Sequence, residues 1–82
     1  MTTLTFYSRP GCGLCESARV ELDGMRADGM KFEVNEVNID DDDGLLKRFL
    51  ALIPVVELDG VVLSELRLDP HELRAKLDTV LP

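Results

Sequence analysis

The sequence of 82 residues predicts one α/β domain over residues 1–82, with the element order βαβαββα. Two segments of alternating polar and apolar residues are each followed by a segment with helical apolar spacing, and a hairpin pattern and a last helix complete the chain. Strands joined through a helix are expected to run parallel, whereas hairpin strands are antiparallel. We therefore expect a four-stranded mixed sheet flanked by three helices.

Alternation predicts a first strand over Thr3–Tyr7, and the turn-forming run Ser8-Arg9-Pro10-Gly11 follows it. Apolar residues at helical spacing then predict the first helix: Leu14, Ala18, Leu22 and Met25. Asp28-Gly29 is expected to end this helix, because glycine readily takes the left-handed conformation that closes helices. The first strand is thus predicted to lead through a short loop into a helix that begins near residue 12.

The middle of the chain predicts a second strand and a second helix. Lys31–Ile39 alternates loosely, with one slip in register. Asp40–Asp43 is expected to open the helix, since carboxylates are favoured at helix N-termini. Ile53-Pro54 ends it. The expected apolar stripe of this helix is Leu45, Leu46, Phe49 and Leu50.

A hairpin and a helix are predicted to complete the domain. Val55–Leu58 and Val61–Leu63 flank Asp59-Gly60, which is a strong signal for a two-residue hairpin turn. The last helix is expected to start at Asp69-Pro70, where the aspartate caps the helix and the proline takes its first position. Glu72 would complete a capping box. The expected inner face is Leu73, Leu77, Val80 and Leu81.

Charge and composition narrow the class of function. The net charge of −7 disfavours contact with nucleic acid or anionic lipid. The apolar runs are far too short to span a membrane, and no secretion signal is visible at Met1–Thr5. We therefore expect a cytoplasmic protein, in a compartment where a lone pair of cysteines is more often catalytic or metal-binding than structural. We also expect a monomer.

Cys12 and Cys15 are the only cysteines and carry the most specific chemistry in the chain. A thiol at the first turn of a helix faces unpaired N–H groups and the positive end of the helix dipole, which favours the thiolate. A second sulfur one turn later can attack the first, so the pair can exchange two electrons. The sequence therefore predicts a thiol–disulfide redox protein.

Other uses of the cysteine pair stay open at this point. A stabilising disulfide would close a loop of only four residues and contribute about 2 kcal/mol. A structural zinc ion needs four ligands, whereas the chain offers one cysteine pair and a single histidine, His71. We therefore expect no metal site within one chain. An iron–sulfur cluster shared between two subunits, or an idle structural pair, are the remaining interpretations.

Three features together make the chain resemble the thioredoxin fold and, within it, a small glutaredoxin-like protein. These are the Cys12-Gly13-Leu14-Cys15 motif at a helix start, Ile53-Pro54-Val55 at the start of the third strand, and the minimal length. Arg9 matches the basic residue that glutaredoxins place three residues before the first cysteine. Phe6 stands where thioredoxins have a buried acid, which favours the glutaredoxin-like assignment.

The resemblance implies a thiol–disulfide oxidoreductase that reduces protein or low-molecular-weight disulfides. Cys12 would be the nucleophile and Cys15 the resolving thiol, with Arg9 biasing the local charge. Gly13 and Leu14 would shape the motif, and Leu14 would offer an apolar contact to the substrate.

The third-strand motif has an implied role as well. A cis Ile53-Pro54 bond facing the cysteines, followed by Val55, would leave the backbone of Ile53 free to pair with an extended substrate. The implied partners are a disulfide substrate and an unidentified reductant.

One departure from the family concerns glutathione. Glutaredoxins carry a Gly-Gly pair after the last strand, where the backbone holds the glutathione carboxylate, but this chain has Leu63-Ser64-Glu65-Leu66. We expect no bound cofactor, and an acid at this place disfavours glutathione as co-substrate. The alternative function is a non-catalytic binding module that docks a partner protein or an iron–sulfur cluster. Gly13 supports the cluster interpretation, since some glutaredoxins that bind clusters lack proline after the first cysteine.

Overall fold

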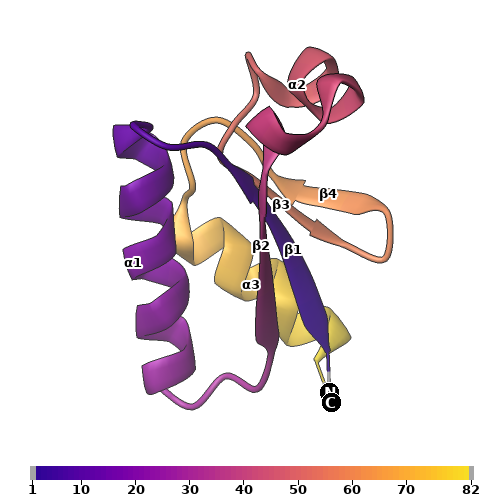
Figure 1. The fold of residues 1–82 in the computed structure, drawn as a ribbon. Coiled ribbons are helices and arrows are strands. Elements are labelled where there is room, and N and C mark those ends of the chain that lie inside the picture. Colours follow the sequence, from indigo (N-terminus) through magenta and orange to yellow (C-terminus); the bar gives the residue numbers. More distant parts are fainter. Residues whose placement is uncertain (1, 82) are drawn as a thin grey trace.

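The computed structural model describes residues 2–81, and its elements confirm the predicted α/β order (Figure 1). The elements are β1 (Thr3–Ser8), α1 (Gly13–Ala27), β2 (Glu33–Asn38), the 3-10 turn η1 (Ile39–Asp41), α2 (Asp43–Phe49), β3 (Val55–Leu58), β4 (Val61–Ser64) and α3 (Pro70–Val80). The strand order is β2-β1-β3-β4. β1 pairs parallel with β2 and antiparallel with β3, which pairs antiparallel with β4. The mixed four-stranded sheet with three helices is therefore as predicted.

The helices lie on both faces of the sheet, with α1 and α3 on one face and α2 on the other (Figure 1). The larger core joins the sheet to α1 and α3 and contains Leu4, Phe6, Cys15, Ala18, Leu22, Met25, Phe32, Val56, Leu73 and Leu77. The smaller core lies under α2 and contains Ile39, Phe49 and Val55. One of the two cysteines therefore belongs to the main hydrophobic core.

The predicted second strand is shortened at both ends, and the aspartate run opens two elements instead of one. The Asn38 side chain accepts a hydrogen bond from the Asp40 N–H (2.9 Å), which turns the chain into η1. Asp42 Oδ1 then accepts from the Leu45 N–H (3.0 Å) and caps α2. Side chains that bond to nearby backbone compete with a strand, so the strand stops before Ile39.

Three residues of the expected apolar stripes do not lie in a core. Leu14 is 48% exposed, and Cys15 takes its place on the buried side of α1. Leu50 and Val80 are half exposed, at 50% and 48%. Leu50 caps the C-terminus of α2, and successive helical residues point about 100° apart, so it points away once Phe49 enters the smaller core. On α3 the stripe continues in four-residue steps from Leu77 to Leu81, which leaves Val80 beside it.

The predicted turns and caps are confirmed, with one exception. Asp59 (φ 50°) and Gly60 (φ 84°) both take the left-handed conformation that a tight hairpin requires. Asp69 Oδ1 accepts from the N–H groups of His71 (2.9 Å) and Glu72 (3.2 Å). The Glu72 carboxylate pairs with Lys76 (2.9 Å). The Glu72 side chain therefore does not bond back to the Asp69 N–H, and the predicted capping box is not formed.

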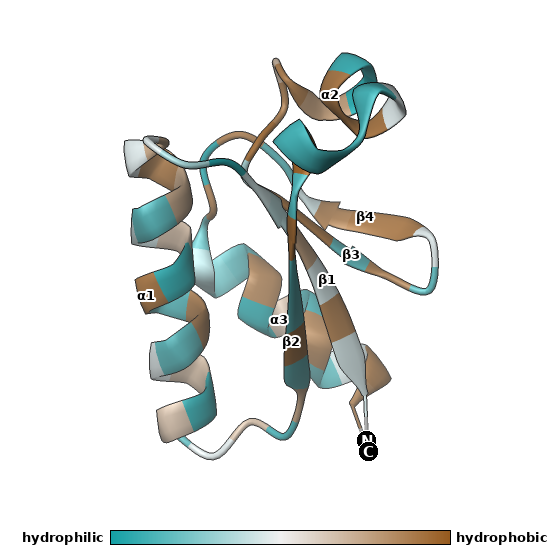
Figure 2. Cartoon of the chain, viewed as in Figure 1, coloured by the Kyte–Doolittle hydropathy of each residue, from teal (hydrophilic) through white to brown (hydrophobic). Residues whose placement is uncertain are grey.

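The two edge strands differ in character (Figure 2). β4 is hydrophobic along most of its length, whereas β2 is mainly hydrophilic. No helix within residues 2–81 combines the length and apolar character that a bilayer crossing would demand.

Candidate functional site

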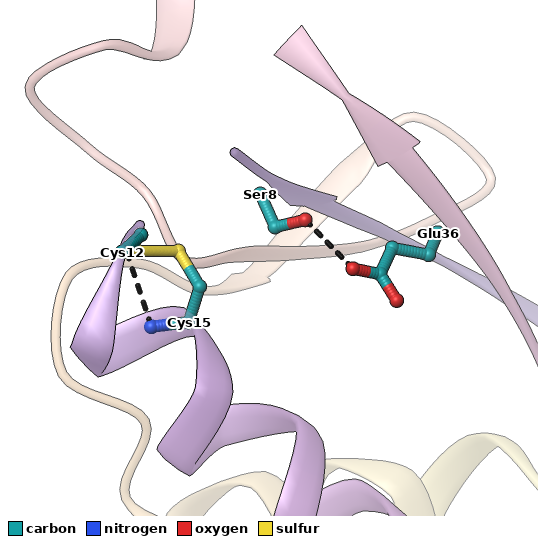
Figure 3. Close-up of a disulfide and its surroundings, with 4 residues drawn as sticks. All are labelled: Ser8, Cys12, Cys15 and Glu36. Atoms are coloured by element: carbon teal, nitrogen blue, oxygen red, sulfur yellow. Dashed lines mark hydrogen bonds between the residues drawn. A yellow bond between two sulfur atoms is a disulfide. The ribbon is translucent and has the colours of Figure 1, made fainter. Parts of the chain in front are cut away.

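The cysteine pair lies where β1 gives way to α1, at one end of the sheet (Figures 1 and 3). Cys12 is the N-cap residue of α1, with extended backbone angles (φ −89°, ψ 103°). Its Sγ accepts a hydrogen bond from the Cys15 N–H (3.2 Å). The two residues form a disulfide, with their Cα atoms 5.2 Å apart. The first sulfur therefore occupies the helix-end position that stabilises an anion, as the sequence predicts.

The two sulfurs differ in access to solvent. Cys15 is only 3% exposed and packs in the core with Ala18 and Leu22. Cys12 is partly buried at the border of the same core. Cys12 is therefore the cysteine nearer the surface, whereas Cys15 is enclosed by the core.

The segment before β3 contains the predicted cis Ile53-Pro54 peptide bond. Pro54 and Val55 are buried, and Ile53 packs against both cores, including the one that contains Cys15. The Ile53 N–H donates to the Phe49 carbonyl at the end of α2 (3.0 Å). The expectation that the Ile53 backbone is free for a substrate is therefore wrong for its N–H group.

The predicted charge contribution of Arg9 is offset by a neighbour. Its guanidinium pairs with Asp40 Oδ1 of η1 (3.1 Å). This partner was not predicted, because the contact depends on how β2 and η1 are placed beside the β1–α1 loop. Arg9 also lines a cavity that adjoins Cys15.

This polar cavity of about 470 Å³ opens beside Cys15, and the sequence pattern did not reveal it. Its lining residues are Ser8, Arg9, Pro10, Gly11, Cys15, Glu16, Arg19, Glu36 and Asn38. Ser8 is 5% exposed, and its hydroxyl donates to Glu36 Oε2 (2.9 Å), as Figure 3 shows beside the disulfide. Arg19 pairs with the other oxygen of the same carboxylate (2.6 Å). Cys15 thus borders a cavity that is lined mostly by polar residues.

One signal for this cavity was present in the sequence. Ser8 continues the alternation of Leu4 and Phe6, so it lies on the buried side of β1. A buried hydroxyl requires a partner. That the partner is Glu36 depends on the parallel pairing of β1 with β2, which places Phe6 opposite Glu36.

The two residues between the cysteines, Gly13 and Leu14, both lie at the surface. Gly13 is the first residue of α1, and a Cβ at this position would have no atom within 4 Å. Leu14 is 48% exposed. Its side chain lines a second cavity with residues of the segment between β4 and α3. Leu14 is therefore available for an apolar contact, as predicted.

Tyr7 lies on the other face of the sheet, under α2. Its ring stacks on Phe49 with centroids 4.3 Å apart, and its hydroxyl donates to Glu57 Oε1 (3.5 Å). Burial, followed by the nearby Glu57 carboxylate, raises the pKa of Tyr7 above 10.0. The positive charge of Arg48 lowers the Tyr7 pKa and so offsets part of this rise. The tyrosine is a structural residue of the smaller core.

Metal-ligating side chains are not gathered anywhere in the described part of the chain, residues 2–81. No three His, Cys, Asp or Glu side chains there come close enough together to hold an ion. A cluster bound through Cys12 would therefore need ligands from outside this chain.

Comparison with known proteins identifies relatives along nearly the whole chain. Residues 3–78 match the family described as "Glutaredoxin-like domain (DUF836)". A glutaredoxin-like protein of Dictyostelium discoideum, described as a YDR286C homolog, is 29% identical over 83 residues. That match covers 95% of this chain and 77% of the relative.

Two solved structures are similar to this chain in fold. Protein XcR50 from X. campestris superposes with a TM-score of 0.74 at 32% identity, covering 94% of this chain and 97% of that one. Oxidised mitochondrial thioredoxin 3 from Saccharomyces cerevisiae gives a TM-score of 0.65 at 14% identity, covering 96% of this chain and 78% of that one. The second likeness concerns the fold alone. With its thioredoxin-like fold and a C-x-x-C pair at disulfide distance, the chain belongs to the glutaredoxin-like domain family.

Proposed function

We propose that this chain is a thiol–disulfide oxidoreductase that reduces disulfides of proteins or small molecules through Cys12 and Cys15. The observation that supports it best is the unequal placement of the two sulfurs. Cys12 caps α1 and borders the surface, whereas Cys15 is 3% exposed. We place the protein in the reducing cytoplasm, where the pair is kept as a dithiol between turnovers.

The reaction transfers two electrons from the dithiol to the substrate. The Cys12 thiolate attacks one sulfur of the substrate disulfide, and the other substrate sulfur leaves as a thiolate that takes a proton from water. Cys15 then loses its proton and attacks Cys12 Sγ, which releases the second substrate thiol. The Cys12–Cys15 disulfide remains, and an external thiol or dithiol reduces it.

The chain's own groups support each step. The Cys15 N–H donates to Cys12 Sγ (3.2 Å), and this hydrogen bond stabilises the charge on the attacking or leaving sulfur. The polar cavity beside Cys15 gives the proton of the buried thiol a path to water. Both features assist a step in which a sulfur carries negative charge.

Separate serine variants of the two cysteines test the assignment. With a mixed disulfide as substrate, Cys12→Ser is expected to lose turnover, whereas Cys15→Ser is expected to accumulate the protein–substrate mixed disulfide detectable by mass spectrometry. Cys12→Ser that turns over like the parent, or a mixed disulfide trapped on Cys15 in place of Cys12, contradicts these two roles.

A binding module without turnover is the second candidate, and the occupied Ile53 N–H favours it. A backbone group that already has a partner in the protein is less available to a substrate strand. The parent protein distinguishes the two functions after anaerobic incubation with iron and sulfide. Visible absorbance that requires Cys12 supports the module, whereas a reversible two-electron couple without metal supports the oxidoreductase.

A further inference from the structure

We infer that the surface around Cys12 selects polypeptide disulfides whose cysteine has apolar neighbours and basic flanking residues, in preference to glutathione. This inference rests on the proposed function, because it names the substrate class of the same site. Four features of the molecule support it: the apolar groups beside the site, one strained residue, the engaged hydrogen-bond donors and the charge of the surface.

Leu14 lies between the two cysteines, and Leu66 lies in the segment between β4 and α3; we refer to these two leucines as the apolar rim. Leu14 and Leu66 are 48% and 49% exposed. A cavity of about 260 Å³ between α1 and the β4–α3 segment is lined by Leu14, Ser17, Ala18, Glu21, Arg67 and Leu68. Pockets for whole small ligands typically measure about 300–1,000 Å³. This cavity lies below that range and can take one side chain of a longer substrate, whereas the cavity of about 470 Å³ beside Cys15 lies within it.

Leu66, in the segment between β4 and α3, is held in an unusual backbone conformation. Its φ of 64° lies in the left-handed region, which is unfavourable for a leucine and natural for glycine or asparagine. Its N–H donates to the Leu52 carbonyl (2.7 Å), one residue before the Ile53-Pro54 bond. The fold thus maintains a strained leucine whose side chain is half exposed, and such strain is concentrated at functional sites.

Three N–H groups at the Leu66 position and at the start of α3 already have acceptors within the chain, which disfavours a carboxylate ligand at these groups. The Leu66 N–H is bonded to Leu52, and the first N–H groups of α3, from His71 and Glu72, donate to Asp69 Oδ1. Glu65 is exposed there and repels an anion. Arg67 is a cation of this segment, but it shares its cavity with the Glu21 carboxylate.

The charge near the site favours a basic partner. The exposed run Asp40–Asp43 lies at the same end of the sheet as the start of α1 (Figure 1). Arg9 pairs with Asp40, but the chain as a whole carries a net charge of −7. Such a surface attracts basic polypeptides and repels glutathione, whose net charge is negative. Charge and apolar rim therefore select the same class of substrate.

Mixed disulfides with one common leaving group, thionitrobenzoate, test the preference. The reduced protein is reacted with mixed disulfides of the peptide Lys-Leu-Cys-Leu-Lys, the peptide Glu-Gly-Cys-Gly-Glu and glutathione, and the yellow leaving thiolate is followed. Each rate constant is divided by that of 2-mercaptoethanol with the same compound, which removes the intrinsic reactivity of the probe. The basic apolar peptide is expected to react roughly tenfold faster than the other two at low salt, and the difference should narrow as salt is raised.

Point variants assign the preference to the rim. Leu66→Asn suits the left-handed conformation, so it removes the apolar group and leaves the fold unstrained. It is expected to lower the ratio of the basic-peptide rate to the glutathione rate by about threefold to tenfold. Val61→Ser is the matched control, because Val61 is 61% exposed on the hairpin and lies outside this rim. It should keep the parent's ratio.

The outcomes separate the substrate preference from the proposed function. A parent protein that reacts with none of the three probes and also fails with hydroxyethyl disulfide contradicts the proposed function. Equal or faster reaction with glutathione contradicts only the substrate preference. A Leu66→Asn ratio equal to that of the parent, or an equal loss in Val61→Ser, overturns the role of the rim.

Discussion

Replacing Ser8 by alanine tests whether the polar cavity beside Cys15 is held by the hydrogen bond to Glu36. Ser8 is 5% exposed, and its Oγ lies 2.9 Å from Glu36 Oε2. A hydrogen bond to a charged group contributes about 1.5–3 kcal/mol. The Glu36 side chain is 33% exposed and keeps Arg19, so water can replace the hydroxyl and reduce the loss. We expect Ser8→Ala to lower the free energy of unfolding by about 1 kcal/mol.

Urea unfolding of the oxidised protein measures this change. The midpoint should fall with an unchanged slope, and the thermal midpoint should fall by roughly 4–8 °C for a loss of about 1 kcal/mol in a domain of this size. Ser17→Ala is the matched control, because Ser17 is exposed on α1. Ser17→Ala should change the free energy of unfolding by no more than about 0.5 kcal/mol.

A double-mutant cycle isolates the contact. In a Glu36→Gln background the acceptor is neutral, so Ser8→Ala should cost less than it does in the parent. If Ser8→Ala is as stable as the parent, or if Ser17→Ala is destabilised equally, the Ser8–Glu36 hydrogen bond does not stabilise the site.

Three further predictions concern the scaffold. Asp69→Ala should lower stability by about 1 kcal/mol in urea titrations, because it leaves the N–H groups of His71 and Glu72 unpaired; an unchanged midpoint contradicts this. Gly60→Ala should cost about 1 kcal/mol, because φ is 84° at that turn; a stabilised variant would show that the turn relaxes. The Tyr7 pKa is raised in the folded state, so the contribution of Tyr7 to stability should be constant below pH 10 and should be lost as pH rises above it. Tyr7→Phe should lose that alkaline dependence in pH-jump unfolding, and its persistence would assign it to other groups.

The local sequence was sufficient for most of the architecture. Alternation, helical spacing and the Asp59-Gly60 turn depend on residues that are neighbours in the chain, and the structure confirms the strands and helices that they predict. Resemblance to a family added the cis Ile53-Pro54 bond, which spacing alone does not predict. The exceptions, Leu14, Leu50 and Val80, lie at helix ends, where the apolar pattern no longer determines which side faces the core.

In the candidate site, too, features set by neighbouring residues could be predicted, whereas features set by tertiary contacts could not. That Cys12 caps a helix was predicted, because one short segment determines it. The expected apolar stripe began at Leu14, whereas in the structure Cys15 takes that place in the core and Leu14 is half exposed. The partners Glu36 of Ser8 and Asp40 of Arg9 come from another strand and turn, and only the pairing of β1 with β2 brings them close.

By itself the sequence determined the order of the elements and the position of Cys12 at a helix start, because both arise from interactions within a few residues. The tertiary structure alone decided what surrounds that residue. The Ile53 N–H donates a hydrogen bond to the Phe49 carbonyl at the end of α2. Leu66, which has a left-handed backbone conformation, donates its N–H to the Leu52 carbonyl. Each contact joins segments that are brought together only when the helices and loops pack at one end of the sheet, and no local pattern encodes that geometry.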